Sequence, residues 1–205
     1  MRNHIYIIIS VFALSLITAC SKNEQKSHPQ MSLNEFSYST GSHWRYLRKN
    51  KSSSVNTTDT ILLKIETLIA STSFQSLNYK CGIYINGVRL DSATLSSSAL
   101  GLTFTPSHYA LLQGFELAFP LYDNQSWGSN QDSFHVSYLS SYTGIDSVYH
   151  SAYQVYNSAW TFGGGENQTI ILVPHIGIVY KSYIGNYYGN QGYKNYTYTL
   201  IDYKL

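Results

Sequence analysis

Apolar and polar side chains alternate along most of the chain after residue 35, which is the pattern of strands with one covered face. Residues 41–47 show it, and residues 132–142 repeat it with Phe134, Val136 and Tyr138 on one side. Residues 60–69 also match helical spacing, but the neighbouring segments favour a strand there. The pattern predicts about nine to eleven strands and little helix.

Turn residues separate these segments. Asn86-Gly87 stands between two apolar runs and predicts a hairpin, because both residues tolerate positive φ. Gly163-Gly164-Gly165 predicts a loose hairpin tip, and Gly114 and Pro120 divide residues 108–121 into two short elements. Residues 50–58 form a polar turn. Further strands are expected in residues 79–90, 92–98, 101–105, 147–160, 169–183 (interrupted by Pro174) and 196–205.

Composition supports this interpretation. The chain has 20 Tyr among 205 residues, and only 12% of its residues are charged, about half the usual share. Tyr and Thr favour pleated, half-buried surfaces, and Gly and Asn favour tight turns. We therefore expect an all-β domain over residues 35–205, built as a single antiparallel, strongly curved sheet, a half-open barrel or a sandwich.

The first 34 residues have a different character. Residues 1–19 have the layout of a secretory signal, with Arg2 at the start, an apolar zone over residues 5–17, and small residues at Thr18-Ala19. This apolar zone is shorter than the roughly 20 residues that a membrane-spanning helix needs. Residues 20–34 are polar without an apolar period, so they predict a flexible tether behind Cys20.

Ile17-Thr18-Ala19-Cys20 resembles the lipobox of bacterial lipoproteins, with an aliphatic residue at −3, a small residue at −1 and the cysteine. The resemblance implies cleavage before Cys20, thioether lipidation of Cys20 and acylation of the new amino terminus. Two or three acyl chains hold a protein stably, because each buried methylene contributes about 0.8 kcal/mol. We therefore expect a membrane-anchored protein of the cell envelope, at the outer membrane on its periplasmic or surface side.

A second resemblance covers most of the mature chain. It consists of three short motifs in this order: Gly41-x-x-Trp44-x-Tyr46, then Phe119-Pro120-Leu121 with Trp127, then Ile176-Gly177-Ile178-Val179. Together they look like a loose group of uncharacterised β-rich lipoproteins from Bacteroidota and other bacteria. The resemblance implies the curved sheet and carries no agreed activity. A glycine often seen before the middle Trp is replaced here by Asn124-Gln125-Ser126.

Individual residues within these motifs have structural interpretations. Trp44 and Trp127 are expected to anchor the core, and Gly177 to permit a bulge or close strand packing. If Cys20 carries lipid, Cys81 has no partner for a disulfide and is expected to be a small buried hydrophobe.

The residues indicate no enzyme, metal or cofactor. The Gly-x-Ser-x-Gly elbow is absent. Acidic pairs of the kind that cleave glycosides could be drawn among Glu66, Glu116, Asp123, Asp132 and Glu166, but nothing favours one pair. The histidines considered as metal ligands lack ligand spacing: His43, His108, His135, His150 and His175. Removal of residues 1–19 takes away Arg2 and leaves 12 basic and 11 acidic residues. This near-neutral balance does not predict the basic surface that binds nucleic acid.

Two further kinds of site are predicted. Tyr183, Tyr187, Tyr188 and Tyr193 lie among amide side chains, a mixture that suits sugars or peptides. The alternative, a hairpin tip over residues 185–192 with strand-face tyrosines, is the interpretation we favour. Thr60, Ser92 and Ser147 each follow an Asp and precede an aliphatic or Ala residue. These triplets resemble the O-glycan acceptors of exported Bacteroidota proteins.

The sequence thus predicts a non-enzymatic, lipid-anchored envelope protein that binds a ligand or partner: an envelope protein, a glycan or a lipid. The alternatives are a structural scaffold acting through protein contacts and, less favoured, a hydrolase. A binding module predicts an apolar or aromatic-lined groove, whereas a scaffold predicts a filled sheet interior. A hydrolase requires a pocket where polar groups of shifted pKa converge.

Overall fold

The computed structural model describes residues 29–36, 38–51, 56–69, 76–98, 100–107, 114–129, 132–161, 164–187 and 193–205. These residues form strands joined by turns, with one short 3-10 segment, η1 (Leu33–Glu35). The predicted all-β antiparallel fold with little helix is confirmed. Within the described residues, no helix has the length and apolar character needed to cross a membrane.

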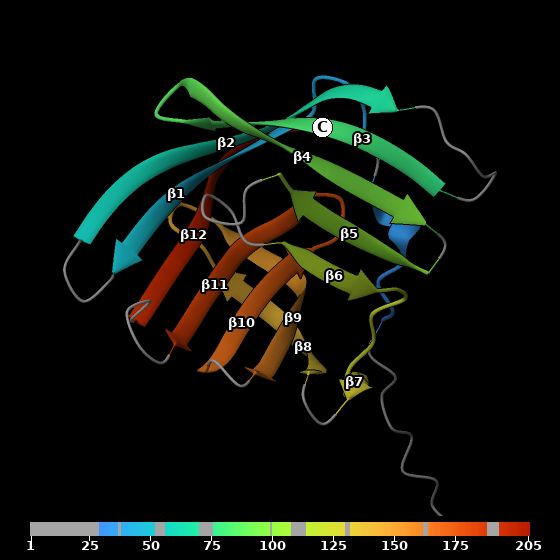
Figure 1. Cartoon of the computed structure of the whole chain (residues 1–205). Helices are drawn as coiled ribbons and strands as arrows, with labels where there is room; N and C mark the ends of the chain where they lie inside the picture. The colour runs from blue at the N-terminus through green and yellow to red at the C-terminus, as the bar shows by residue number, and fades with distance from the viewer. Residues whose placement is uncertain are drawn as a thin grey trace, which may run out of the picture.

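In the described residues, twelve strands make up one antiparallel sheet (Figure 1). Their bounds are β1 (His43–Lys51), β2 (Asn56–Ile69), β3 (Ser76–Ile85), β4 (Val88–Ser98), β5 (Gly101–Pro106), β6 (Phe115–Ala118), β7 (Ser126–Ser129), β8 (Asp132–Thr143), β9 (Val148–Thr161), β10 (Gly164–Val173), β11 (Gly177–Tyr187) and β12 (Tyr193–Lys204). The count exceeds the predicted nine to eleven because β7 is too short to show alternation. The polar turn expected at residues 50–58 is shorter, since β1 reaches Lys51 and β2 begins at Asn56.

The order of strands explains the curvature. The sheet runs β6-β5-β4-β3-β2-β1-β12-β11-β10-β9-β8-β7, so two six-stranded meanders meet where β1 pairs with β12. Strands β6 and β7 follow each other in the chain yet lie at opposite edges of the sheet. The connecting residues 119–125 can span no more than about 25–30 Å. The sheet must therefore curl until its edges approach, which produces the expected half-open barrel.

In Figure 1 the first half of the sheet, β1–β6, faces the second half, β7–β12, across the interior. The inner face of the first half is apolar and includes Trp44, Ile61, Ile65 and Leu95, all buried. Cys81 is fully buried, and burial raises the pKa of its thiol to about 12, which confirms its interpretation as a small core residue.

The predictions for the Asn86-Gly87 turn, for Trp44 and for Gly177 are confirmed. Asn86 and Gly87 both have positive φ (49° and 86°) in the turn between β3 and β4, as the hairpin signal requires. Trp44 is 4% exposed, and its Nε1 donates to the Ile176 carbonyl at 2.8 Å. Gly177 has φ of 103°, and a Cβ there would lie 3.4 Å from Trp44 Nε1. Glycine at 177 thus permits both the turn conformation and the close approach to the indole. Trp127 is half-buried and stacks on Phe134 with ring centres 4.9 Å apart.

Residues 29–36 lie against the seam where the two edges approach. Met31 and Leu121 are fully buried and exchange two backbone hydrogen bonds of 2.9 Å. Phe36 packs edge-on against Phe119, with ring centres 5.7 Å apart. Met31, which lies in the segment that the sequence pattern assigned to the tether, therefore packs into the body of the sheet. A single buried Met among polar neighbours leaves no periodic signal to reveal this.

Candidate functional site

Polar side chains replace apolar ones in two consecutive rows on the inner face of the second half, and these rows continue onto the ends of β1 and β2. Strand pairing aligns Asn157, Gln168, Tyr183, Tyr196 and Asn50 across β9, β10, β11, β12 and β1. Residues two positions along these strands share the same face. The structure therefore builds a continuous polar strip on the concave side.

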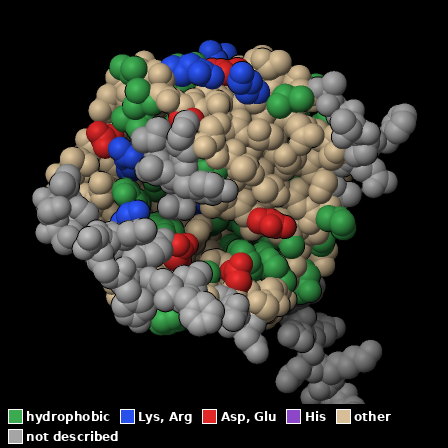
Figure 2. Space-filling model, in the orientation of Figure 1, with side chains coloured by type: hydrophobic (Ala, Val, Ile, Leu, Met, Phe, Trp, Pro, Cys, Tyr) green, Lys and Arg blue, Asp and Glu red, His purple; other side chains and the backbone are tan. Residues whose placement is uncertain are grey.

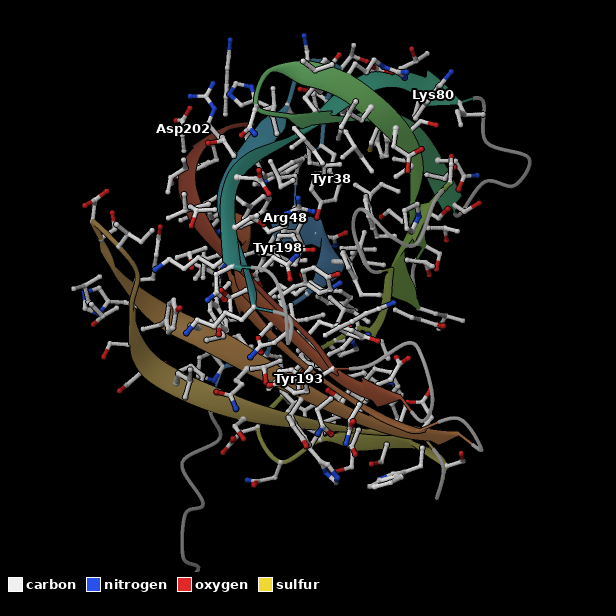
Figure 3. The ribbon with its side chains drawn as sticks, turned by 60° about the vertical axis from the view of Figure 1, so that its left-hand side comes forward. Tyr38, Arg48, Lys80, Tyr193, Tyr198 and Asp202 are labelled. Atoms are coloured by element: carbon white, nitrogen blue, oxygen red, sulfur yellow. The ribbon has the colours of Figure 1, made fainter. Side chains whose placement is uncertain are left out.

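The neighbouring row combines buried charge with apolar residues. It aligns Val155, Ile170, Lys181, Tyr198, Arg48 and Asp59. Arg48 Nη2 donates to Asp59 Oδ2 at 2.7 Å, and this bond is the main cause that lowers the pKa of Asp59. Figure 3 shows Arg48 and Tyr198 together between the two halves, with Lys80 and Asp202 on the outer side.

A cavity of about 260 Å³ opens between β6 and the inner face of β8, β9 and β10. Its polar lining comes from Glu116, Asp132, Asn157, Glu166 and Gln168. The apolar lining residues are Phe115, Phe134, Val155, Ala159 and Ile170. This mixture of aromatic, amide and carboxylate groups is typical of sites that orient a small polar ligand.

One side-chain hydrogen bond fixes the position of two residues that line this cavity. Asn157 is buried, and its Nδ2 donates to Asp132 Oδ1 at 2.5 Å. The bond holds the carboxylate of Asp132, which is exposed, against a rigid strand of the sheet. Glu166 lies half-buried in the same cross-strand row as Ala159 and Asp132. A ligand would thus meet preformed acceptors on one side of the cavity.

Charge along the chain reinforces this picture. Residues 90–180 contain no Lys or Arg but six Asp and Glu. Figure 2 shows acidic side chains gathered around the hollow on this face, with Lys and Arg at the upper and left margins. The three carboxylates that line the cavity, Glu116, Asp132 and Glu166, therefore favour ligands with cationic or hydroxyl donor groups.

A second cavity, of about 60 Å³, lies deeper and has an almost wholly apolar lining that includes Trp44, Phe104 and Tyr198. Lys181 also lines it and is only 4% exposed. Its ammonium lies 5.3 Å from the centre of the Phe115 ring and 3.4 Å from the Gly114 carbonyl oxygen. Burial lowers the pKa of Lys181 to about 7. Phe115 lines both cavities, so it separates the apolar interior from the acidic opening.

The structure brings together three of the five acidic residues considered from the sequence. Glu116, Asp132 and Glu166 line the larger cavity. Glu66 lies elsewhere, bonded to Arg89 at 2.9 Å and to the Tyr84 hydroxyl at 3.0 Å. Asp123 accepts a bond from the backbone of Tyr138 at 2.8 Å, which is a structural role.

Of the four tyrosines predicted as ligand contacts, the two whose side chains are described differ in their exposure to solvent. Tyr183 is fully buried and packs against Tyr196 with ring centres 6.2 Å apart, so it offers no surface to an incoming ligand. Tyr193 is 41% exposed at the start of β12, and its role stays a prediction. The Tyr187 side chain and Tyr188 lie outside the described residues, as do His108, Cys20 and the whole of residues 1–28.

The predicted modification sites also differ in setting. Thr60 is half-buried within β2, and Ser92 Oγ lies 3.0 Å from Ser107 Oγ. Ser147 is exposed in the loop between β8 and β9, which is the most accessible setting of the three. A glycan on any of them stays a prediction. In the described part of the chain, no group of three or more His, Cys, Asp or Glu is arranged to hold a metal ion.

Sequence inspection missed the amides of the cavity and Lys181. A signal for Lys181 exists, because it stands two residues from Val179 and from Tyr183 and must share their inward face. The same spacing relates Asn157 to Val155 and Gln168 to Ile170, but amides are common throughout this chain, so the spacing alone does not single these two out.

Comparison with known proteins gives no family. No family model matches the chain, and no curated protein matches it. Similar solved structures include a candidate exported protein with a YmcC-like fold from Bacteroides fragilis (TM-score 0.47, 12% identity) and a candidate lipoprotein from Parabacteroides distasonis (TM-score 0.45, 10% identity). Each similarity covers 86% of this chain and 100% of the other. At these values the likeness assigns neither family nor function.

Proposed function

We propose that the protein is a lipid-anchored component of the cell envelope, held at the outer membrane through Cys20, that binds a small polar ligand without transforming it. The ligand occupies the cavity between β6 and β8–β10. The observation that carries the proposal is the lining of that cavity, where carboxylates and amides converge beside aromatic rings.

The division of the interior supports binding over a purely structural role. A scaffold needs only a filled core, and the first half of the sheet supplies one. Asp132 and Glu166 of the second half instead line a space of about 260 Å³, together with Glu116 of the facing edge strand β6. Charged and amide groups around open space contribute little to packing, so their placement favours recognition of a ligand that donates hydrogen bonds.

Thermal unfolding with a panel of cationic and polyhydroxyl compounds tests the cavity. A compound that binds the native state raises Tm, by mass action, in a concentration-dependent way. We use amino sugars, polyamines and neutral disaccharides as probes. We expect at least one class to stabilise the full chain, and Glu166→Gln to weaken that effect about tenfold or more by removing a charged acceptor. Asp146→Asn is the matched control, because it removes one negative charge from an exposed loop.

Equal stabilisation of Glu166→Gln and the parent chain would show that the cavity is not the site. Turnover of any bound compound, detected by mass spectrometry, would support the hydrolase alternative instead. Partners that co-purify from native membranes equally well with both chains would support the scaffold alternative.

The anchor is tested separately with the two cysteines. We expect Cys20→Ser to release the protein from membranes in a carbonate wash, because serine lacks the thiol to which the lipid is joined as a thioether. Cys81→Ala should remain in the pellet, since Cys81 is a buried core residue. Retention of Cys20→Ser in the membrane fraction would contradict the proposed lipid anchor.

A further inference from the structure

Trp160, near the end of β9, is the most exposed aromatic side chain among the described residues, with 64% of its surface accessible. The other two tryptophans are buried or half-buried. Exposed apolar surface is unfavourable in water. An indole that is exposed on the surface of the sheet is therefore a candidate contact for a ligand.

The backbone opposite Trp160 holds the ring in a defined position. Trp160 pairs directly with Gly165 across β9 and β10. A Cβ on residue 165 would lie 3.4 Å from Cε3 and Cζ3 of the indole and 3.5 Å from Cδ2. Contact with several atoms of the ring at similar distances means that the indole lies flat over Gly165. One face of the ring is packed on backbone, and the exposed surface belongs largely to the other face.

The surroundings of this ring are polar and uncharged. A depression of about 230 Å³ is lined by Trp160, Gly165, Asn167, Ile184 and Asn186. The Tyr156 hydroxyl donates to Asn167 Oδ1 at 2.9 Å, which orients that amide and leaves its NH2 group as a donor. Asn167 and Asn186 are both exposed. The depression thus offers one flat apolar surface flanked by amide groups.

We propose that this outer platform, formed by Trp160, Asn167, Ile184 and Asn186, binds a neutral pyranose unit of a glycan chain. The C–H-rich face of a pyranose is apolar and flat enough to stack on the indole, while its hydroxyls exchange hydrogen bonds with the two amides. None of the lining residues is charged, which favours a neutral sugar over a phosphorylated or sulfated ligand.

The platform is independent of the concave cavity. Alternate residues of β9 and β10 point to opposite faces, so Asn157 and Gln168 line the inner cavity whereas Trp160 and Asn167 form the outer platform. A ligand can therefore occupy one site when the other is empty. The platform adjoins one end of the Tyr-rich site expected from the sequence, because its Asn186 pairs with Tyr193 across β11 and β12, but its aromatic surface is Trp160 and not the buried Tyr183.

The test is affinity gel electrophoresis of the full chain in a zwitterionic detergent without a sugar headgroup. The probes are four neutral polysaccharides cast into the gel: dextran, laminarin, glucomannan and yeast mannan. We expect at least one to retard the protein, Trp160→Ala to weaken retardation about tenfold, and Trp160→Phe to retain part of it because a ring remains. Tyr203→Ala is the matched control, since Tyr203 is an exposed aromatic elsewhere on the sheet.

Quenching of Trp fluorescence by iodide gives a second measurement that a folding defect does not imitate. The quenchable emission should come chiefly from Trp160, and the retarding polysaccharide should protect it. Absence of retardation by all four probes, or retardation unchanged in Trp160→Ala, would overturn the proposal. A blue shift of Trp160 emission on adding phosphatidylcholine vesicles, without polysaccharide binding, would assign the exposed indole to a membrane surface and overturn it as well.

Discussion

The two halves of this sheet share one architecture and differ in what they enclose. Residues 43–89, which form β1–β3 and the start of β4, contain seven Lys and Arg and two Asp and Glu. Residues 90–180 contain no Lys or Arg and six Asp and Glu. On the inside, the first half contributes mainly apolar side chains, whereas β9–β12 contribute the polar rows and the buried Lys181.

The difference indicates a division of roles within one sheet. The first half shares with the second half an apolar cavity of about 60 Å³. The second half borders a cavity four times larger with carboxylates and amides on its walls. We expect the apolar first half to supply the larger share of the packing energy, which offsets the cost of the polar groups that line the second half. Three substitutions sharpen or break this comparison.

Trp44→Ala should have the largest effect, because it removes the aromatic centre of the apolar half. The indole is buried, packs edge-on against Tyr38 at 5.5 Å and donates to the Ile176 carbonyl. We expect the free energy of unfolding to fall by about 3–5 kcal/mol. Urea denaturation measures it, with Trp160→Ala as a control that should cost less than about 1 kcal/mol. Similar losses in the two variants would contradict the assignment of stability to the first half.

Lys181→Met should have an intermediate effect of the opposite sign. The ammonium is buried among apolar side chains, so its charge costs desolvation energy that a methionine does not. We expect a gain of about 1–4 kcal/mol at pH 6. Destabilisation by this substitution would show that the buried cation is a required part of the fold.

The pH dependence of the parent chain gives a second measurement for Lys181. Its folded-state pKa of about 7 lies below its value in the unfolded chain, so between these values the unfolded state binds more protons. Stability should therefore rise from pH 7 to 9 in the parent chain, and this rise should be absent in Lys181→Met. Measurements should end near pH 9, because burial raises the pKa of the Cys81 thiol and of Tyr198 to about 12, and both groups reverse the trend at higher pH.

Asp59→Asn should have the smallest effect. It removes the carboxylate that Arg48 and Asn86 both bind, at 2.7 Å and 3.1 Å, and so weakens the link from the interior to the β3–β4 turn. We expect a loss of about 1 kcal/mol at pH 7. Because the folded-state pKa of Asp59 is lowered, its contribution is present above about pH 4 and disappears as the pH falls further. A pH-independent difference between the two chains would contradict this origin.

The sequence by itself determined the local features of this protein. Period-two alternation predicted the strands, and Asn86-Gly87 predicted its turn. These features depend on neighbours in the chain, and a one-dimensional pattern records them. Met31 shows the limit of such local patterns, since its burial depends on Leu121, which lies ninety residues away in the chain.

Only the tertiary structure decided which side chains share a site. Register places Asp132 beside Ala159 and Glu166, and curvature then brings Glu116 from the opposite edge of the sheet to the same cavity. A shift of one residue in any of these pairings would turn the side chains to the other face. Five acidic residues looked equivalent in the sequence, because distance in space depends on strand order and closure of the sheet, and no short motif encodes either.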